Sequence, residues 1–157
     1  MPKYFHSVKV IARNRKAFHD YEILDKFEAG IELYGTEVKA IRAGRIALTD
    51  SFALCQGGQI FLNRLHISPY ELGNRFNHEP YRKRRLLLHQ REIRYLCSQV
   101  EQKRLALIPL QVYFKKQWVK VELGLARGRK QYDKRQKIAA QESKRRLSRV
   151  MGEALRR

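Results

Sequence analysis

The chain of 157 residues lacks the features that define several large protein classes. Its two cysteines, Cys55 and Cys97, lie far apart without a metal-binding spacing, which disfavours a zinc ribbon or a disulfide scaffold and predicts buried thiols in a reducing compartment. The longest apolar run, Leu105–Leu110, has six residues and is too short to cross a bilayer. The first ten residues lack the apolar core of a signal peptide. We therefore expect a cytoplasmic protein without a membrane anchor.

Motifs of the common enzyme classes are also missing. No glycine is followed by lysine, which excludes the usual phosphate-binding loop, and neither G-x-G-x-x-G nor G-x-S-x-G occurs. His78-Glu79 begins like a zinc protease helix, but Pro80 follows and Arg82 stands where the second histidine belongs. The four aspartates are too dispersed to suggest a metal nuclease. The sequence predicts no cofactor, no metal and no enzymatic activity.

Positive charge is abundant. Thirty-four Lys and Arg against fifteen Asp and Glu give a net charge of +19, which would repel itself without an anionic partner. Hydrophobic residues make up 43% of the chain and aromatic residues 10%, a composition that can form a core. The sequence therefore predicts a folded body that binds a polyanion.

The charge is concentrated at the C-terminal end. Residues 127–157 hold twelve Lys or Arg against three acids, a net charge of +9, and no Gly or Pro lies between Gly128 and Gly152. Four apolar residues would share one face of a helix there: Leu147, Val150, Met151 and Leu155. We divide the chain into a body, 1–126, and a basic tail, 127–157, that is disordered alone and becomes helical on its partner. A merely solvated basic tail is the alternative.

The body is predicted to be mainly β. Alternating, β-branched and aromatic patterns predict strands over residues 7–12, 19–33, 51–54, 59–64, 106–114 and 118–125. Gly57-Gly58 predicts a hairpin, and helices are expected near 35–43 and 86–100. Short strands without βαβ alternation favour a small closed antiparallel barrel of the oligonucleotide-binding (OB) type with flanking helices. An SH3-like barrel is the alternative.

Several polar and basic positions of the body could contact nucleic acid. One group precedes and begins the second strand: Asn14, Lys16, His19 and Tyr21. A second is the run Arg82-Lys83-Arg84-Arg85, which would enter the helix at 86–100 through its N-terminal end, where the helix dipole favours phosphate. Lys39 and Arg42 would face outward from the short helix. A metal-independent nuclease using His19, Tyr21 and Glu28 stays open as an alternative.

Four segments, read together, resemble the SmpB family of bacterial SsrA-binding proteins. They are the stretch from Phe27 to Gly44 (FEAGIELYGTEVKAIRAG), Asp50-Ser51-Phe52, the stretch from Arg84 to Ile93 (RRLLLHQREI), and the stretch from Gly128 to Arg135 (GRKQYDKR). The resemblance runs from about Ser7 to the C-terminus, so it covers nearly the whole chain.

The resemblance implies an OB-type barrel that binds the tRNA-like domain of transfer-messenger RNA and delivers it to stalled ribosomes for trans-translation. The protein would replace the missing anticodon arm in the small-subunit decoding centre and the mRNA channel. Alanyl-tRNA synthetase and elongation factor Tu are expected in the same RNA complex, and the protein is expected to be a monomer. The RNA-facing positions implied for the body are Asn14, Lys16, His19, Tyr21, Glu28, Leu87 and His89.

The resemblance also assigns roles to the tail. Gly128 would give a bend, and the ribosome-facing positions that follow would be Arg129, Lys130, Tyr132, Asp133, Lys134 and Arg135. Tyr132 would stack on a decoding base, although some relatives carry histidine there. Val150 and Met151 would lie in the mRNA channel. The alternative function is a structural or general ribosome-associated basic RNA-binding protein.

Overall fold

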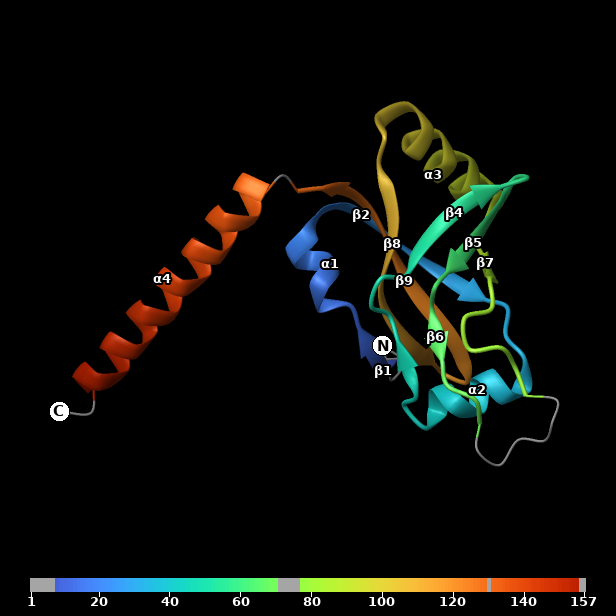
Figure 1. The fold of residues 1–157 in the computed structure, drawn as a ribbon, viewed down its shortest axis with the longest axis horizontal. Coiled ribbons are helices and arrows are strands. Elements are labelled where there is room, and N and C mark those ends of the chain that lie inside the picture. Colours follow the sequence, from blue (N-terminus) through green and yellow to red (C-terminus); the bar gives the residue numbers. More distant parts are fainter. Residues whose placement is uncertain (1–7, 71–76, 130, 156–157) are drawn as a thin grey trace, which may run out of the picture.

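The computed structural model describes residues 8–70, 77–129 and 131–155, which form nine strands and four helices (Figure 1). The strands are β1 Val8–Arg13, β2 Tyr21–Ile31, β3 Ile46–Ala47, β4 Phe52–Gln56, β5 Gln59–Asn63, β6 His66–Ile67, β7 Arg84–Leu87, β8 Ala106–Lys115 and β9 Trp118–Gly128. The helices are α1 Arg15–Asp20, α2 Gly35–Arg42, α3 Gln90–Lys103 and α4 Gln131–Leu155. The mainly-β class predicted from the sequence is confirmed.

Six antiparallel strands close into a ring. Their order is β8-β4-β5-β7-β2-β9, and β9 pairs again with β8, while β1 joins the outer side of β8. The β4–β5 hairpin turns at Gly57 and Gly58, whose φ angles of 56° and 74° are left-handed and suit glycine. This confirms the predicted hairpin. Each strand of the ring has a partner on both sides, although the β2–β7 and β4–β8 contacts are short.

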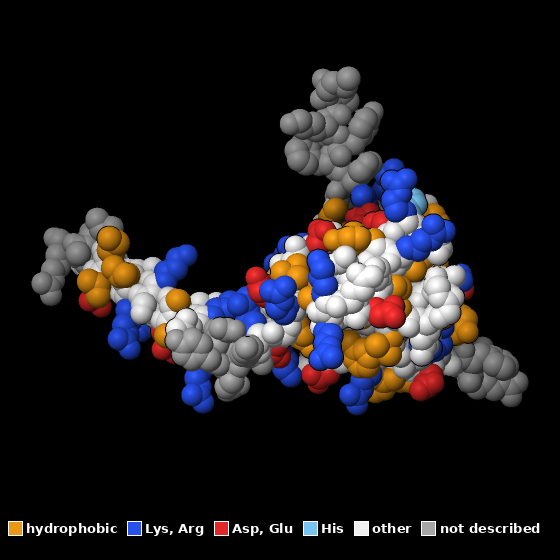
Figure 2. All heavy atoms as spheres, turned by 90° about the horizontal axis from the view of Figure 1, so that it is seen from above, with side chains coloured by type: hydrophobic (Ala, Val, Ile, Leu, Met, Phe, Trp, Pro, Cys, Tyr) orange, Lys and Arg blue, Asp and Glu red, His pale blue; other side chains and the backbone are white. Residues whose placement is uncertain are grey.

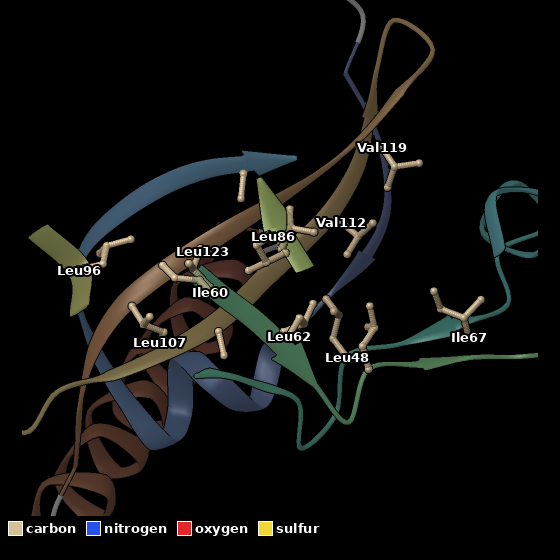
Figure 3. Packing of buried hydrophobic residues seen from close by; sticks show 14 of the residues in the cluster. Leu48, Ile60, Leu62, Ile67, Leu86, Leu96, Leu107, Val112, Val119 and Leu123 are labelled. Carbon is tan, nitrogen blue, oxygen red and sulfur yellow. The ribbon is translucent and has the colours of Figure 1, made fainter. Parts of the chain in front are cut away.

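The interior of the ring holds the hydrophobic core. Alternate residues of the strands point inward, as the side chains in Figure 3 show, and the labelled members include Ile60, Leu62, Leu86, Leu107, Val112 and Leu123. All of these are at most 2% exposed. At about 25 cal/mol per Å² of buried apolar surface, this packing is the main stabilising contribution to the body.

Helices α3 and α2 lie at opposite ends of the ring (Figure 1). In α3, Ile93 and Leu96 are buried against the core. The prediction of a helix at 86–100 was wrong at its start, because residues Arg84–Leu87 pair with β2 and β5 as β7 and the helix begins at Gln90. The strand predicted at 19–33 begins only at Tyr21, because His19 and Asp20 belong to α1.

Cys55 and Cys97 are joined by a disulfide, so the expectation of two separate thiols was wrong. Cys55 lies on β4 and Cys97 on α3, and their Cα atoms are 5.9 Å apart. The bond connects a strand of the ring to the helix at its end. Forty-two positions separate the two residues in sequence, a distance that hid their proximity.

The tail is one long helix, α4, that leaves the body as a rod in Figure 1. Strand β9 continues to Gly128, two residues beyond the predicted boundary at 126, because its last residue pairs with Tyr21. Near the start of α4, Lys137 Nζ donates a hydrogen bond to the Phe18 carbonyl of α1.

Among the helices within the described ranges, none has both the length and the apolar character needed to span a membrane.

Candidate RNA interface

Three of the predicted RNA-facing residues meet at one recess of the body. Glu28 of β2, Leu87 of β7 and His89, which caps α3, line this recess of about 540 Å³, although Glu28 is far from the other two in sequence. Arg85 and Lys120 lie on its wall and contribute positive charge. We call it the Glu28 recess. It offers an apolar contact, a carboxylate and cations within one concave surface, which suits an irregular RNA surface.

The backbone around Leu87 explains why that side chain is presented. Leu87 pairs with Gly30 across the β2–β7 ladder, and a Cβ on Gly30 would lie 3.2 Å from the Leu87 Cβ. Glycine therefore allows the close approach of the two strands, and Leu87 remains 47% exposed. Directly after β7, the His89 backbone N–H donates to Glu92 Oε1 at 3.3 Å, which satisfies one donor at the N-terminus of α3.

Two side chains of β8 hold the Glu28 carboxylate. The Tyr113 hydroxyl donates to Oε2 at 2.5 Å, and Lys115 Nζ lies 3.2 Å from Oε1. The hydrogen bond from Tyr113, with the Lys115 ammonium, lowers the pKa of Glu28 below its ordinary 4.5, although partial burial opposes the shift. Burial and the hydrogen bond to Glu28 raise the pKa of Tyr113. At neutral pH the pair is thus a neutral donor and an ionised acceptor.

Sequence reasoning missed Lys120 and Tyr113. Lys120 pairs with Gly30 on one side and with Tyr113 on the other, because β9 lies between β2 and β8. The alternation of apolar and polar residues along β9 predicts an outward-facing Lys120, since Val119 and Val121 on either side of it are buried. No pattern in the sequence revealed the contact between Tyr113 and Glu28, which are 85 positions apart.

The group at residues 14–21 forms a different surface. Lys16 and Tyr21 line a second recess of about 490 Å³ that shares no lining residue with the Glu28 recess. Lys16 Nζ makes an exposed ion pair with Asp50 at 3.2 Å. His19 Nδ1 lies 2.9 Å from Asp20 Oδ1. Three of the four predicted residues, Asn14, Lys16 and Tyr21, therefore line this recess, and His19 does not.

Asn14 has a structural role besides the RNA contact expected for it. Asn14 is only 7% exposed, and its side chain accepts from the Ala17 N–H at 3.2 Å and donates to the Pro109 carbonyl at 3.0 Å. The side chain therefore caps α1 and ties it to β8. Asn14 also lines the second recess, so its RNA contact stays a prediction beside this structural role.

The RNA contact predicted for Arg84 needs correction, because this residue is completely buried. Its guanidinium pairs with the buried Glu37 of α2 and donates to the Leu65 carbonyl at 2.8 Å. Burial alone would raise the pKa of Glu37, but hydrogen bonds from Arg82, the Tyr34 backbone and Arg84 outweigh it and lower that pKa. Arg84 is thus part of a buried ion pair that fastens α2 to β7, and it cannot reach RNA without unfolding.

The other cations of the run lie at the surface beside aromatic rings. Arg82 lies over the Tyr34 ring, with 4.2 Å from Cζ to the ring centre, and its Nη2 is 2.6 Å from Glu37 Oε1. Lys83 Nζ lies 4.3 Å above the centre of the Phe61 ring. Arg85 Nε is 3.0 Å from Glu32 Oε2. These positions line a shallow recess of about 430 Å³.

Lys39 and Arg42 are exposed on α2, as predicted, but they do not line the Glu28 recess. Lys39 Nζ is 5.5 Å from the centre of the Tyr70 ring, and the Arg42 guanidinium carbon is 5.8 Å from that of Phe114. They extend the positive surface at the α2 end of the ring. Their charge can contribute affinity for phosphate without sequence preference.

The described part of the tail presents charge and an apolar face together. The Arg129 backbone N–H donates to the Asp20 carbonyl at 2.9 Å, and Arg135 is exposed at the start of α4. Val150 and Met151 are 64% and 63% exposed. Lys130 and the side chains of Tyr132, Asp133 and Lys134 lie outside the described residues.

Basic side chains are spread over the body and along the tail (Figure 2). On the visible face, Lys and Arg outnumber the acidic side chains, in agreement with the net charge of +19. In the described portion of the chain, no group of three or more His, Cys, Asp or Glu is placed to hold a metal ion. The surface chemistry is therefore that of an anion-binding protein whose recesses combine basic side chains with carboxylates.

Comparisons with known proteins agree with this chemistry. The family model described as "SmpB protein" matches residues 11–153. An SsrA-binding protein of Carboxydothermus hydrogenoformans is 55% identical over 143 residues, 91% of this chain and 96% of the relative. One of Bacillus cytotoxicus is 53% identical over 150 residues, with 96% of each chain covered.

A solved structure is similar as well. It is described as "tmRNA-SmpB: a journey to the center of the bacterial ribosome", and its matching chain is 54% identical with a TM-score of 0.65. The match covers 76% of this chain and 85% of the other. Sequence, fold and surface chemistry lead to the same conclusion: the chain belongs to the SmpB family.

Proposed function

We propose that this protein binds the tRNA-like domain of transfer-messenger RNA and delivers it to stalled ribosomes for trans-translation. The observation that carries the proposal is the convergence of Glu28, Leu87 and His89 on one recess, in a chain of the SmpB family. Glu28 cannot attract phosphate, so its place in a basic surface indicates hydrogen bonding to base or ribose donors. Arg85 and Lys120 on the same wall supply phosphate contacts.

The tail has a separate role in this proposal. It occupies the decoding centre and the mRNA channel, with Arg129, Lys130, Lys134 and Arg135 on ribosomal RNA and Tyr132 stacked on an exposed base. Val150 and Met151 lie farther along the channel. We propose that α4 depends on the ribosome for stable order, since its described apolar residues have no core to bury them. Its charge favours binding along an RNA-lined channel.

The proposal also covers the protein's partners and state. The protein acts as a cytoplasmic monomer and is not an enzyme; its contribution is recognition and placement of the RNA. Alanyl-tRNA synthetase and elongation factor Tu act on the same RNA complex. The alternative is a general ribosome-associated basic protein, but a carboxylate fixed inside the Glu28 recess would weaken purely phosphate-directed binding.

Reversal of the Glu28 charge tests the proposal. Glu28→Arg raises the net charge by two, yet we expect it to weaken binding to a transcript of the tRNA-like domain by at least about tenfold, because it removes a specific acceptor. Fluorescence anisotropy at fixed salt measures the affinity. Glu101→Arg, at an exposed position of α3 outside the recess, is the matched control and should not weaken binding. Equal or tighter binding by Glu28→Arg would exclude the recess as the recognition site.

A further inference from the structure

The contacts of Glu28 differ in how firmly each partner is held. Tyr113 is 6% exposed, so its hydroxyl is fixed by the packing of β8, whereas the Glu28 side chain is 38% exposed and opens onto the recess. Lys115, the other partner, is 39% exposed. Strand β9 lies between β2 and β8, so the hydrogen bond from Tyr113 joins two strands that are not neighbours. The buried tyrosine is the rigid part of this arrangement.

A glutamate without a fixed hydrogen-bond donor could pair with other cations in so basic a surface. Its neighbours are charged or titratable from every side: Lys115 on β8, Lys120 and Glu122 on β9, Lys26 on β2, and Arg85, His89 and Glu92 around the recess. Without a fixed donor the carboxylate could turn toward Lys115, which does not line the recess, and leave the recess. The bond from Tyr113 holds Oε2 in place, and Oε1, which accepts from Lys115, keeps a further lone pair for another donor.

We propose that Tyr113 is a positioning residue for RNA recognition, which aims the Glu28 carboxylate at hydrogen-bond donors of RNA in the recess. The donors that fit are base N–H groups and ribose hydroxyls, because an ionised carboxylate accepts hydrogen bonds from them. The ionised phosphate oxygens of RNA have no proton to donate. Tyr113 itself does not line the recess and acts through Glu28. This inference rests on the proposed function, because it requires that RNA occupies the Glu28 recess.

A double-mutant cycle in the full-length protein tests the inference. The variants are Tyr113→Phe, Glu28→Gln and their combination, and the probe is a transcript of the tRNA-like domain of transfer-messenger RNA. We expect Tyr113→Phe to weaken binding about tenfold when Glu28 is present, as for the loss of a hydrogen bond to a charged group, and to have no effect in the E28Q background. Tyr95→Phe removes a hydroxyl from exposed Tyr95 of α3 and should leave the affinity unchanged.

The outcomes separate the two proposals. If E28Q leaves the RNA affinity unchanged, both the recess and the role of Tyr113 are refuted. If E28Q weakens binding but Tyr113→Phe has no effect, or has the same effect in both backgrounds, the recess stands and the positioning role is refuted, because a merely structural tyrosine does not act through Glu28.

A measurement without RNA guards against a variant that simply folds poorly. Carboxyl carbon NMR of the free protein follows the titration of Glu28. Since the hydrogen bond from Tyr113 lowers the pKa of Glu28, we expect that pKa to rise toward its ordinary value in Tyr113→Phe and to stay unchanged in Tyr95→Phe. An unchanged Glu28 pKa in a folded Tyr113→Phe variant would overturn the inference.

Discussion

The body and the tail helix α4 are built on opposite principles. In the body, residues such as Leu62, Leu86 and Leu123 are fully buried inside a closed ring of strands. In α4, Leu147, Val150 and Met151 are more than 60% exposed. The body therefore has a core that stabilises it before any partner arrives, whereas the tail keeps apolar and basic residues available for a partner.

The body and the tail obtain their binding energy from different sources. A prefolded recess can place a carboxylate such as Glu28 with accuracy, which gives specificity. A long basic helix gains its energy mainly by displacing counterions from RNA, which gives affinity without base preference. Three perturbations test the contrast, because each should act on one region and leave the other unchanged.

Breaking the buried ion pair should have the largest effect. Glu37→Gln leaves the guanidinium of Arg84 buried without its counter-charge, and we expect the free energy of unfolding to fall by about 3–5 kcal/mol. Glu32→Gln is the matched control: it removes the exposed partner of Arg85 and should cost less than about 1 kcal/mol. Urea denaturation measures both. Similar losses in the two variants would contradict the assigned importance of the buried pair.

The same pair predicts an acid dependence. The pKa of Glu37 is lower in the folded protein than its ordinary 4.5, so the unfolded chain binds that proton more tightly. The stabilisation is therefore complete above this ordinary pKa and is lost as the pH falls below it. The E37Q variant should lack this component, and its stability should decline less steeply with acid than that of the wild type.

Opening the disulfide should have the next largest effect. Cys55 and Cys97 are 42 positions apart, and release of a loop of this length should lower the free energy of unfolding by about 2–4 kcal/mol. Thermal unfolding with and without reductant measures the loss, and the double variant C55S/C97S should be insensitive to reductant. The helicity of α4 should not change. Mass spectrometry of the unreduced protein that finds two free thiols would contradict the cross-link.

Paired glycine substitutions give the smallest and most selective test. In the body, a Cβ at Gly124 would lie 2.9 Å from Leu110 Cδ1, and Leu110 is buried, so Gly124→Ala should cost about 1–3 kcal/mol. In α4, a Cβ at Gly152 meets nothing within 4 Å, so Gly152→Ala should favour the helix by about 1 kcal/mol. For Gly152→Ala, circular dichroism should show greater helicity than in the wild type and an unchanged melting temperature of the body. A similar shift of that temperature by both variants would contradict the independence of the two regions.

Much of the body could be predicted from the sequence because its strands alternate. The inward Val119, Val121 and Leu123 of β9 follow the period of two, and Gly57-Gly58 supplies the expected hairpin turn. The start of α3 could not be predicted, because the apolar residues of β7 run directly into the helical pattern that follows. A short apolar run of this kind fits a strand and a buried helix equally well.

The candidate site was predictable only in part. The resemblance to a family implied that Glu28, Leu87 and His89 face RNA, and the structure places all three around one recess. The partners of Glu28 and Arg84 could not be found from the sequence, because their closest contacts lie 85 and 47 positions away. A run of arginines in a sequence gives no sign that one of them is buried against a distant carboxylate.

The division between body and tail is the central claim, and the RNA recovered from a cell lysate tests it most directly. The full chain should be compared with a chain that ends after Arg129, which keeps β9 and the hydrogen bond from Arg129 to Asp20. We predict that transfer-messenger RNA dominates both samples and that ribosomal RNA is enriched only by the full chain. If the shortened chain loses transfer-messenger RNA, or both samples mirror bulk ribosomal and transfer RNA, the account is contradicted.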